Sequence, residues 1–517
     1  MRRAVIVATA ILFCAGQAFG KPTGAPLSLE QMARVKFPEP PLTAAEERVV
    51  RAARDGTEAD CRDLGGGDDP AKVDAWPASR NVRANLIRWL FVDRGARELV
   101  DPKGVAIRGA RITGRLDLSF TNVLFPLFLS GCRLAQDLDV RYAKMPVLSL
   151  EGSWTRAIKA DGLKLEGDIL LRNGFHAQGE VRLLGAGIGG NLDAKGGTFK
   201  NPKGYALNAD RIKVTGSVFL TIGFGAEGDV RLVDAEITGQ LAVVDAWLDA
   251  LELESAHITG PFFWGNIHKD AHPDFPSKEW KPYLDLINAK VGALADKEAS
   301  WPAWGRLRLD GFVYDRIAAG PIDAAARLRW LHLQPDWLGF RPQPYEQLIA
   351  VLRNMGHEDQ VAEVAIAEKL DLREHGGLGR WSKFWSFVLY HAVGYGYEPW
   401  RVFKWMAMLV LLGTLIFWSA HLSAVGVMVP SDKEAYERDE RTEKAPLPHY
   451  YPKFNALVYS LDVIFPFDLG QKSHWRLSER QSGAFVYWIF EGWSLVQLVV
   501  GWVLLLVAAA VAAGLVK

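Results

Sequence analysis

The chain has 517 residues, and its 60 Lys and Arg residues balance 60 Asp and Glu residues, so the formal net charge at pH 7 is zero. This balance excludes the strongly basic class of nucleic-acid-binding proteins, and we expect no nucleic-acid partner. The length allows several domains, and the 19 Trp residues are an unusually large number.

The N-terminus has the three parts of a secretory signal. Two arginines after the first Met precede an apolar run over residues 4–16, and the small residues Ala18 and Gly20 follow. We predict a signal peptide over residues 1–20, with an uncleaved anchor helix as the alternative. Either arrangement exports the domain that follows.

Helical patterns occupy residues 27–108. Thr43–Glu46 is a capping box that should open a helix ending near Gly56, and a second helical pattern runs from about Arg80 to Val92. An open end of stacked strands invites polymerisation. We therefore interpret this region as a helical N-terminal cap.

The chain then repeats itself. Ala157–Phe199 and Ala206–Leu248 align without a gap at an offset of 49, with 17 identities in 43 positions. A duplication at this scale predicts stacked structural units.

A finer repeat lies inside the long one. Apolar residues two positions apart recur every 21 to 26 residues, and in a strand such residues point to the same side. A second series lies about half a step from the first, so we predict a mainly β protein: a β-solenoid of about nine coils over residues 109–317, with two short strands per coil. The widest step contains 201–204, which should bulge from a corner. The first series is Leu127/Leu129, Leu148/Leu150, Ile169/Leu171, Leu192/Ala194, Val218/Leu220, Leu241/Val243, Phe262/Trp264, Leu284/Leu286 and Leu307/Leu309; the second is Leu116/Leu118, Leu138/Val140, Val181/Leu183, Leu207/Ala209, Val230/Leu232 and Leu251/Leu253.

The position between two paired apolar residues is often charged. Charges of both signs keep a long sheet soluble. We interpret this outer wall as a solvated surface, with a binding face as the alternative. The charged positions are Asp117, Asp139, Arg182, Asp193, Arg231, Glu252, Asp285 and Arg308.

For the part of the chain after the solenoid we predict helices and a membrane domain. Patterns over 323–333, 345–355 and 359–374 predict a helical C-terminal cap over residues 318–380. Beyond it, 381–517 should form a membrane domain, with the lipid bilayer as a partner.

Two segments of this domain are long and apolar enough to cross a bilayer, from about Val402 to Val429 and from about Phe485 to Val516. They predict two transmembrane helices and an intervening loop. The aromatic stretch Trp381–Tyr390 should lie along the interface. An exported solenoid places the loop in the cytoplasm; Arg401 and Lys404 oppose that orientation, whereas the loop ends support it. The basic residues at the loop ends are Lys433, Arg438, Arg441, Lys472, Arg476 and Arg480, against Lys517 alone at the far end.

Cysteines and short motifs give few chemical leads. Cys14 would leave with the signal peptide, and Cys61 and Cys132 could form a disulfide only if the fold brings them together. Gly185–Gly190 matches the dinucleotide fingerprint, but a further solenoid strand follows it, so we interpret it as structural. We assign no catalytic or cofactor-binding residues, and we expect no cofactor.

One segment has the residue types of a metal site. His268, Asp270 and His272 are candidate ligands, because a helix would bring their side chains onto one face. Pro273 disfavours helical geometry there. A loop that leaves the solenoid is therefore the competing interpretation.

Two membrane motifs invite a channel interpretation. Val393–Tyr397 resembles the filter of potassium channels, but it precedes both spans, and we interpret it as a bend at the membrane surface. Residues 454–465 form either a short helix that enters the bilayer or one that packs at the interface. The first alternative is channel-like and predicts a conductance that depends on Asp462.

Several segments are distinctive in combination. They are the GEVRLLGA and GDVRL units at Gly179 and Gly228, Pro342–Leu348, Gly394–Trp400 and Phe454–Leu461. Together they resemble a bacterial family of membrane-anchored proteins with pentapeptide-like solenoids, whose members often carry the name membrane-associated oxidoreductase. The resemblance implies a membrane-anchored bacterial protein, and it supplies no catalytic residues. With the two spans and the signal sequence, we expect a multi-pass protein of the bacterial inner membrane whose solenoid is exported to the periplasmic or outer side.

We expect a membrane-anchored β-solenoid scaffold or binding module for a protein or envelope partner, since solenoids offer extended faces and few concave pockets. The alternatives are an oxidoreductase, as the family name implies, and a two-span channel-like protein. An oligomer is compatible with each of them.

Overall fold

The computed structural model describes residues 27–422, 427–432, 447–478 and 483–513. The predicted signal peptide over 1–20, Cys14, most of the basic loop residues and Lys517 lie outside these ranges. The chain forms two compact units, Met1–Arg308 with Val313–Gly320, and Leu309–Phe312 with Pro321–Lys517.

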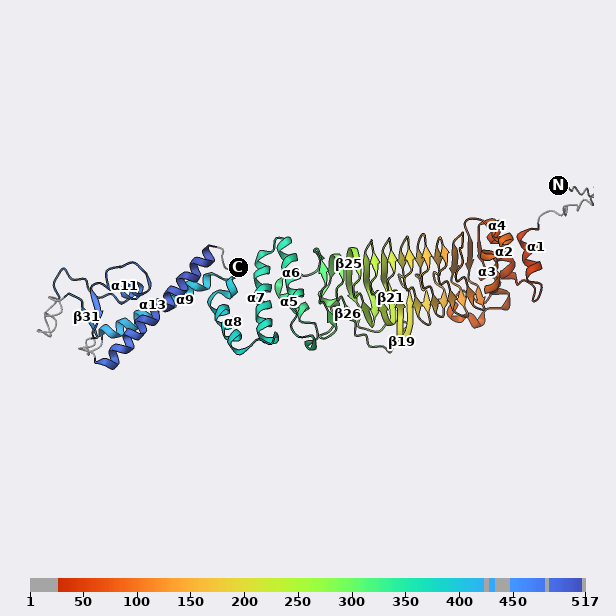
Figure 1. The fold of residues 1–517 in the computed structure, drawn as a ribbon. Helices are drawn as coiled ribbons and strands as arrows, with labels where there is room; N and C mark the ends of the chain where they lie inside the picture. Colours follow the sequence, from red (N-terminus) through yellow and green to blue (C-terminus); the bar gives the residue numbers. More distant parts are fainter. Residues whose placement is uncertain (1–26, 423–426, 433–446, 479–482, 514–517) are drawn as a thin grey trace, which may run out of the picture. The chain divides into compact units, whose positions relative to one another are not determined.

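The first unit is a parallel β-solenoid of about nine coils, as predicted (Figure 1). The earlier coils have four short strands where two were predicted. In one coil these are β6, β7, β8 and β9, which pair with β10, β11, β12 and β13 of the next. In later coils, sides of the coil merge into longer strands such as β21. Two of the four sides contribute a single inward side chain, such as Leu134 or Met145, and so leave no apolar pair in the sequence. The strands of this ladder are β1 (Glu58–Asp60), β2 (Asn81–Arg83), β3 (Val105–Arg108), β4 (Arg111–Thr113), β5 (Leu116–Asp117), β6 (Leu127–Ser130), β7 (Arg133–Leu134), β8 (Leu138–Asp139), β9 (Lys144–Met145), β10 (Leu148–Ser149), β11 (Trp154–Thr155), β12 (Ile158–Lys159), β13 (Lys164–Leu165), β14 (Ile169–Leu170), β15 (His176–Ala177), β16 (Val181–Arg182), β17 (Gly187–Ile188), β18 (Leu192–Asp193), β19 (Thr198–Asn208), β20 (Lys213–Val214), β21 (Val218–Arg231), β22 (Glu236–Ile237), β23 (Leu241–Leu248), β24 (Ala250–Glu252), β25 (His257–Ile267), β26 (Tyr283–Asp285), β27 (Lys290–Asp296), β28 (Leu307–Arg308), β29 (Val313–Tyr314) and β30 (Ile317–Ala319).

Inward side chains stack from coil to coil into a continuous apolar core. Leu171, Leu220 and Val243 were predicted to point inward, and each is 0% exposed. Leu220 pairs in register with Val243 on the next coil. Burial of such side chains supplies the main stabilisation of the solenoid.

An insertion changes the phase of the last coils. Leu284 was predicted to continue the series of Phe262, but it pairs with Leu251, and Leu294 is the partner of Phe262. The insertion over 268–282 separates the two series by about half a coil. Even spacing in the sequence therefore hides a change of face.

The corners of the coils use left-handed backbone. Phe120 and Tyr142 have φ of 55° and 54°, and their N–H groups donate to Arg141 O and Asp161 O of the following coil, each at 2.8 Å. A left-handed residue at the same corner of each coil keeps the coils in register. This corner column is Phe120, Tyr142, Gly162, Gly185, Arg211, Asp234, Ser255 and Asn288.

The predicted bulge is present. β19 and β21 pair on both sides of 201–204, with a register shift between Lys200 and Tyr205. These four residues project from the edge of the coil, in the yellow strand pair of Figure 1.

The N-terminal region contains α1 (Leu29–Lys36), α2 (Ala44–Asp55), α3 (Ala84–Val92) and α4 (Arg94–Leu99), and it also contributes β1 and β2 to the ladder. The capping box at Thr43 forms as expected, and α2 ends at Gly56 with left-handed φ of 64°. Glu46 is 0% exposed and also accepts hydrogen bonds from Arg83.

The second unit begins with three helices close to those expected, α5 (Ala324–Leu331), α6 (Gln343–Asn354) and α7 (Glu358–His375). Then follow α8 (Arg380–Val393), α9 (Trp400–Leu422), α11 (Ala456–Ile464) and α13 (Ala484–Ala512), with an antiparallel strand pair of β31 (Met428–Pro430) and β32 (Trp475–Leu477). Among the described residues, α9 and α13 are long and apolar enough to cross a membrane.

Candidate functional site

The outer residues between paired apolar positions form one column along the solenoid, which we term the charged face. Neighbours in this column belong to successive coils and pair with one another or with the adjacent corner: Arg308 binds Asp285 at 2.8 Å, Arg231 binds Asp210 at 3.0 Å, and Arg182 binds Asp161 at 2.8 Å. Because its charges neutralise each other, the charged face reads as a solvated surface. The column is Asp117, Asp139, Lys159, Arg182, Asn208, Arg231, Glu252, Asp285 and Arg308, whereas Asp193 lies on a different side, on β18.

A hollow of about 440 Å³ interrupts the charged face near the insertion. Burial raises the pKa of Asp229 and of Glu252. Lys278 neutralises a third carboxylate, that of Asp249, at 2.7 Å. The lining is mostly charged, and Tyr283 is the one aromatic residue among its side chains, whereas aromatic clusters dominate protein interfaces. The lining residues are Asp229, Asp249, Ala250, Glu252, Glu279, Lys281, Tyr283 and Arg306.

The candidate metal ligands lie in the insertion and have other partners. His268 Nε2 is 2.7 Å from Asp245 and its ring stacks on Trp247, while His268 Nδ1 is 3.5 Å from Asp270. His272 is 5% exposed, its Nδ1 accepts from the backbone of Asp274, and burial lowers its pKa. In the described ranges no group of three or more His, Cys, Asp or Glu residues is placed to hold a metal ion. Metal binding at these residues stays a prediction.

The insertion completes an outer aromatic column. Trp154 stacks on His176 with ring centroids 4.2 Å apart, and Trp247 stacks on His268 at 3.9 Å. Between these two stacks lie the small residues Thr198 and Gly225, in register with His176 and Trp247. The gap therefore needs a filler from elsewhere in the chain.

Insertion residues fill that gap. A Cβ on Gly225 would lie 2.8 Å from His272 Nε2, so glycine makes room for this imidazole. Asp274 accepts a hydrogen bond from Thr198 at 2.8 Å and lies 3.2 Å from His176 Nε2. The histidines are thus explained by packing of the insertion onto earlier coils.

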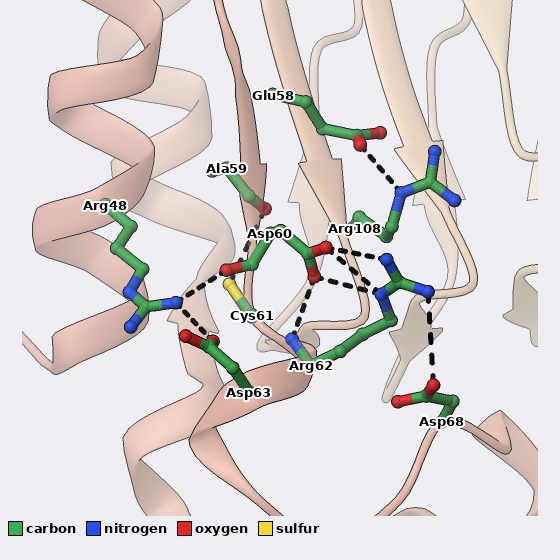
Figure 2. Close-up of polar contacts among 9 residues, drawn as sticks. All are labelled: Arg48, Glu58, Ala59, Asp60, Cys61, Arg62, Asp63, Asp68 and Arg108. Carbon is green, nitrogen blue, oxygen red and sulfur yellow. Dashed lines mark hydrogen bonds and ion pairs between the residues drawn. The ribbon is translucent and has the colours of Figure 1, made fainter.

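Figure 2 shows the polar contacts around Cys61, at the start of the ladder. Arg48 donates to Asp60 O at 2.7 Å and pairs with Asp63, while Arg62 binds the Asp60 carboxylate at 2.7 Å. The hydrogen bonds from Arg62 lower the pKa of Asp60 to about 2. Burial raises the pKa of the Cys61 thiol to about 11, despite the nearby arginines.

The two described cysteines are free thiols and both are buried. Burial raises the pKa of Cys132 to about 12. Asp60 pairs with Arg108, which pairs with Ser130, so Cys61 and Cys132 are two rungs apart. At roughly 4.8 Å per rung their Cα atoms are too distant for a disulfide, which needs less than about 7 Å. Neither thiol has the exposed thiolate that redox chemistry requires.

The exposed apolar feature of the early coils is an aromatic pair, which we term the aromatic corner. Phe120 is 74% exposed and Tyr142 is 56% exposed, and their rings stack with centroids 5.1 Å apart. The Tyr142 ring extends over Gly162, where a Cβ would lie 2.6 Å from its Cδ1. Leu124 nearby in the sequence is 62% exposed.

The aromatic corner is strained as well as exposed. Bulky residues with positive φ are outliers, and the left-handed conformation costs roughly 1–2 kcal/mol for a residue other than glycine. Gly162 and Gly185 occupy the same corner without that cost. The same left-handed backbone recurs at Arg211, Asp234, Ser255 and Asn288 of the corner column, so the exposed ring stack is what distinguishes Phe120 and Tyr142. The sequence analysis did not identify Phe120 and Tyr142, because their shared corner depends on the register of the coils.

In the second unit, α11 packs against both α9 and α13. We term α8, α9, α11 and α13 the membrane unit, after the two helices of membrane-spanning length. Ser460 donates to Val410 O near the middle of α9 at 2.9 Å, and Gln497 near the middle of α13 donates to Ser460 O at 3.0 Å. Ser460 and Gln497 are both 0% exposed. A Cβ on Gly413 would collide with both of these side chains.

Two acidic residues of this unit differ in their exposure. Asp462 is 3% exposed and accepts backbone hydrogen bonds from Leu469, Gln471 at 2.8 Å and Lys472 at 3.0 Å, so it holds the turn after α11. Glu491 is exposed on α13.

The filter-like segment is a bend. Residues 394–396 form a single turn between α8 and α9, in which Tyr395 has φ of 55° and its hydroxyl contacts Ser386 at 2.7 Å. Comparison of the chain with family models, with curated proteins and with solved structures found no match.

Proposed function

We propose that this protein is a membrane-anchored scaffold whose solenoid binds a protein partner through the aromatic corner. The exposed, strained stack of Phe120 and Tyr142 is the observation that carries the proposal. Aromatic side chains supply most of the energy at protein interfaces, because each one buries a large area at a low cost in side-chain entropy.

The other surfaces of the solenoid are less suited to bind a protein. The charged face pairs its charges internally, and the hollow beside it is polar. Gly162 occupies the same corner of the coil without an exposed ring and without the backbone cost. Neither solubility nor the turn therefore requires the exposed aromatic pair. Burial of both rings by a partner would offset the free-energy cost of the left-handed backbone.

The test uses photo-crosslinking in membranes with the full chain. A benzoylphenylalanine at position 142 should give one adduct of defined mass, and the same probe at Lys164, exposed on β13, should give none. Phe120→Ser should abolish the adduct while circular dichroism stays unchanged. Equal adducts at 142 and 164, or none at either, would refute the aromatic corner as a binding site.

The anchor is the second part of the proposal. We infer that α9 and α13 cross the bacterial inner membrane, with the solenoid on the periplasmic side. Exposed aromatic residues on α8 suit the headgroup layer, with Trp381 71% and Trp385 50% exposed. Protease added to spheroplasts should digest the solenoid; complete protection would reverse the orientation.

A channel-like function is the second candidate, because one observation favours it. Ser460 donates to Val410 near the middle of α9 and accepts from Gln497 near the middle of α13, which is the depth of a helix that enters the bilayer. Polar backbone at that depth is stable where protein surrounds it.

Planar-bilayer recordings separate the two candidates. A channel-like protein would conduct ions, and Asp462→Asn would alter that conductance. A scaffold would be silent in the bilayer and would keep its crosslinked adduct when Asp462 is changed.

A further inference from the structure

A groove in the membrane unit is lined by apolar side chains of three helices. It lies between α8, α9 and α13 and has a volume of about 390 Å³. Phe387 comes from α8, Met408 and Leu412 come from α9, and Val500 and Leu504 come from α13. The size and lining suit an extended hydrocarbon chain.

A second cavity of about 400 Å³ adjoins the groove at the start of α9. The two cavities share the lining residues His391, Trp405 and Met408, so they lie side by side. Trp405 Nε1 donates to His391 O at 2.7 Å, which fixes the wall between them. This second cavity also contains Arg401 and Lys404, so an apolar end is joined to a basic end.

The basic end has one unneutralised cation. Arg401 pairs with Glu398 and donates to Tyr390 O at 2.9 Å. Lys404 is exposed and has no ion-pair partner within the described part of the chain. Both side chains come from the first turns of α9, where the helix dipole also favours an anion.

We propose that a phospholipid with an anionic headgroup binds here. One acyl chain fills the groove, and the headgroup phosphate is bound by Lys404 beside Arg401. Trp400, 58% exposed, lies at the headgroup level, as tryptophan does at membrane interfaces. Basic pockets between membrane helices bind anionic lipid in this way. The inference rests on the proposed membrane anchor.

The test measures lipid binding to the full-length protein in detergent by native mass spectrometry. Phosphatidylglycerol should bind at least fivefold more tightly than phosphatidylcholine. Lys404→Gln should weaken phosphatidylglycerol binding about fivefold, since one basic side chain near the membrane contributes about 1 kcal/mol. Lys383→Gln is the matched control, because Lys383 is exposed on α8 and lines neither cavity.

Two further measurements test the groove and the source of the phosphate. Leu412→Trp should fill the groove and weaken both lipids alike. Glycerol 3-phosphate, which has no acyl chains, should not displace bound lipid; if it does, the site binds a free phosphate compound and the lipid proposal is wrong. Equal affinity for the two lipids, or an unchanged Lys404→Gln, would also overturn it.

Failure of the anchor gives a different result. If alkaline carbonate releases the protein from membranes, α9 and α13 do not span, and the proposed anchor is wrong. If the protein resists extraction and shows no preference for phosphatidylglycerol, the anchor stands and the lipid site alone fails.

Discussion

The solenoid and the membrane unit satisfy their buried groups in opposite ways. Each inward side chain of the solenoid, such as Leu220, stacks on equivalents in neighbouring coils. The membrane unit depends on single contacts, such as the Ser460 and Gln497 bonds beside Gly413. A repeated contact leaves a periodic signal in the sequence, and a single contact does not.

The first prediction tests repetition in the core. Leu220→Ala should lower the free energy of unfolding by about 2–5 kcal/mol, because it opens a cavity between closely packed coils. Urea unfolding followed by far-UV circular dichroism measures the loss. Lys213→Ala, at an exposed position of β20, should change it by less than about 0.5 kcal/mol. Equal effects would mean that neighbouring coils close the cavity.

The second prediction tests the single contact. Gly413→Leu should destabilise the membrane unit by about 1–3 kcal/mol, since the added side chain collides with Ser460 and Gln497. Thermal unfolding in detergent, followed by tryptophan fluorescence, measures the change. Leu411→Ala is the control, because Leu411 is 62% exposed. No difference between the two variants would show that α11 is not held at this position.

The third prediction concerns strain at the corners. Arg211 has φ of 56° and occupies the corner column without an aromatic ring, so Arg211→Gly should raise the free energy of unfolding by about 1 kcal/mol. Tyr142→Gly should gain less, because it also loses the stack on Phe120. The same urea assay serves both variants. A loss of stability in Arg211→Gly would contradict a strained corner.

The smallest predicted effect is a pH dependence in the helices of the second unit. The hydrogen bond to Asp371 raises the pKa of His332, which lies 2.9 Å from that carboxylate. The stabilisation is complete below the unfolded pKa near 6.5 and is lost as pH rises through the higher folded value. The His332 side chain is 53% exposed, so the change should stay below about 1 kcal/mol. Thermal unfolding between pH 5.5 and 8.5 measures it, and His332→Gln should flatten the profile.

Much of the fold was predictable because it is periodic. The inward positions of Leu171, Leu220 and Val243, the capping box at Thr43 and both membrane-length helices follow from spacing and local chemistry. The four-sided coil was missed, because two sides carry one inward residue each. The prediction that Leu284 continues the series of Phe262 was wrong. An insertion of about half a coil leaves the spacing in the sequence unchanged while it moves Leu284 to another side of the coil.

The sites were harder to predict, since they depend on which residues share a corner or a gap. The stack of Phe120 on Tyr142 requires the coil register, and the packing of His272 on Gly225 requires the course of the insertion. The small residues Thr198 and Gly225 in an otherwise aromatic column were the available signal. Without the register, that signal cannot be recognised.

The insertion also has a mechanical consequence. A pulling force along the solenoid would load its parallel rungs, which could then separate one after another. Asp274 fastens the insertion to His176 and Thr198, several rungs before the strand from which it leaves. Those rungs must therefore rupture together, which makes the middle of the rod tougher than its ends.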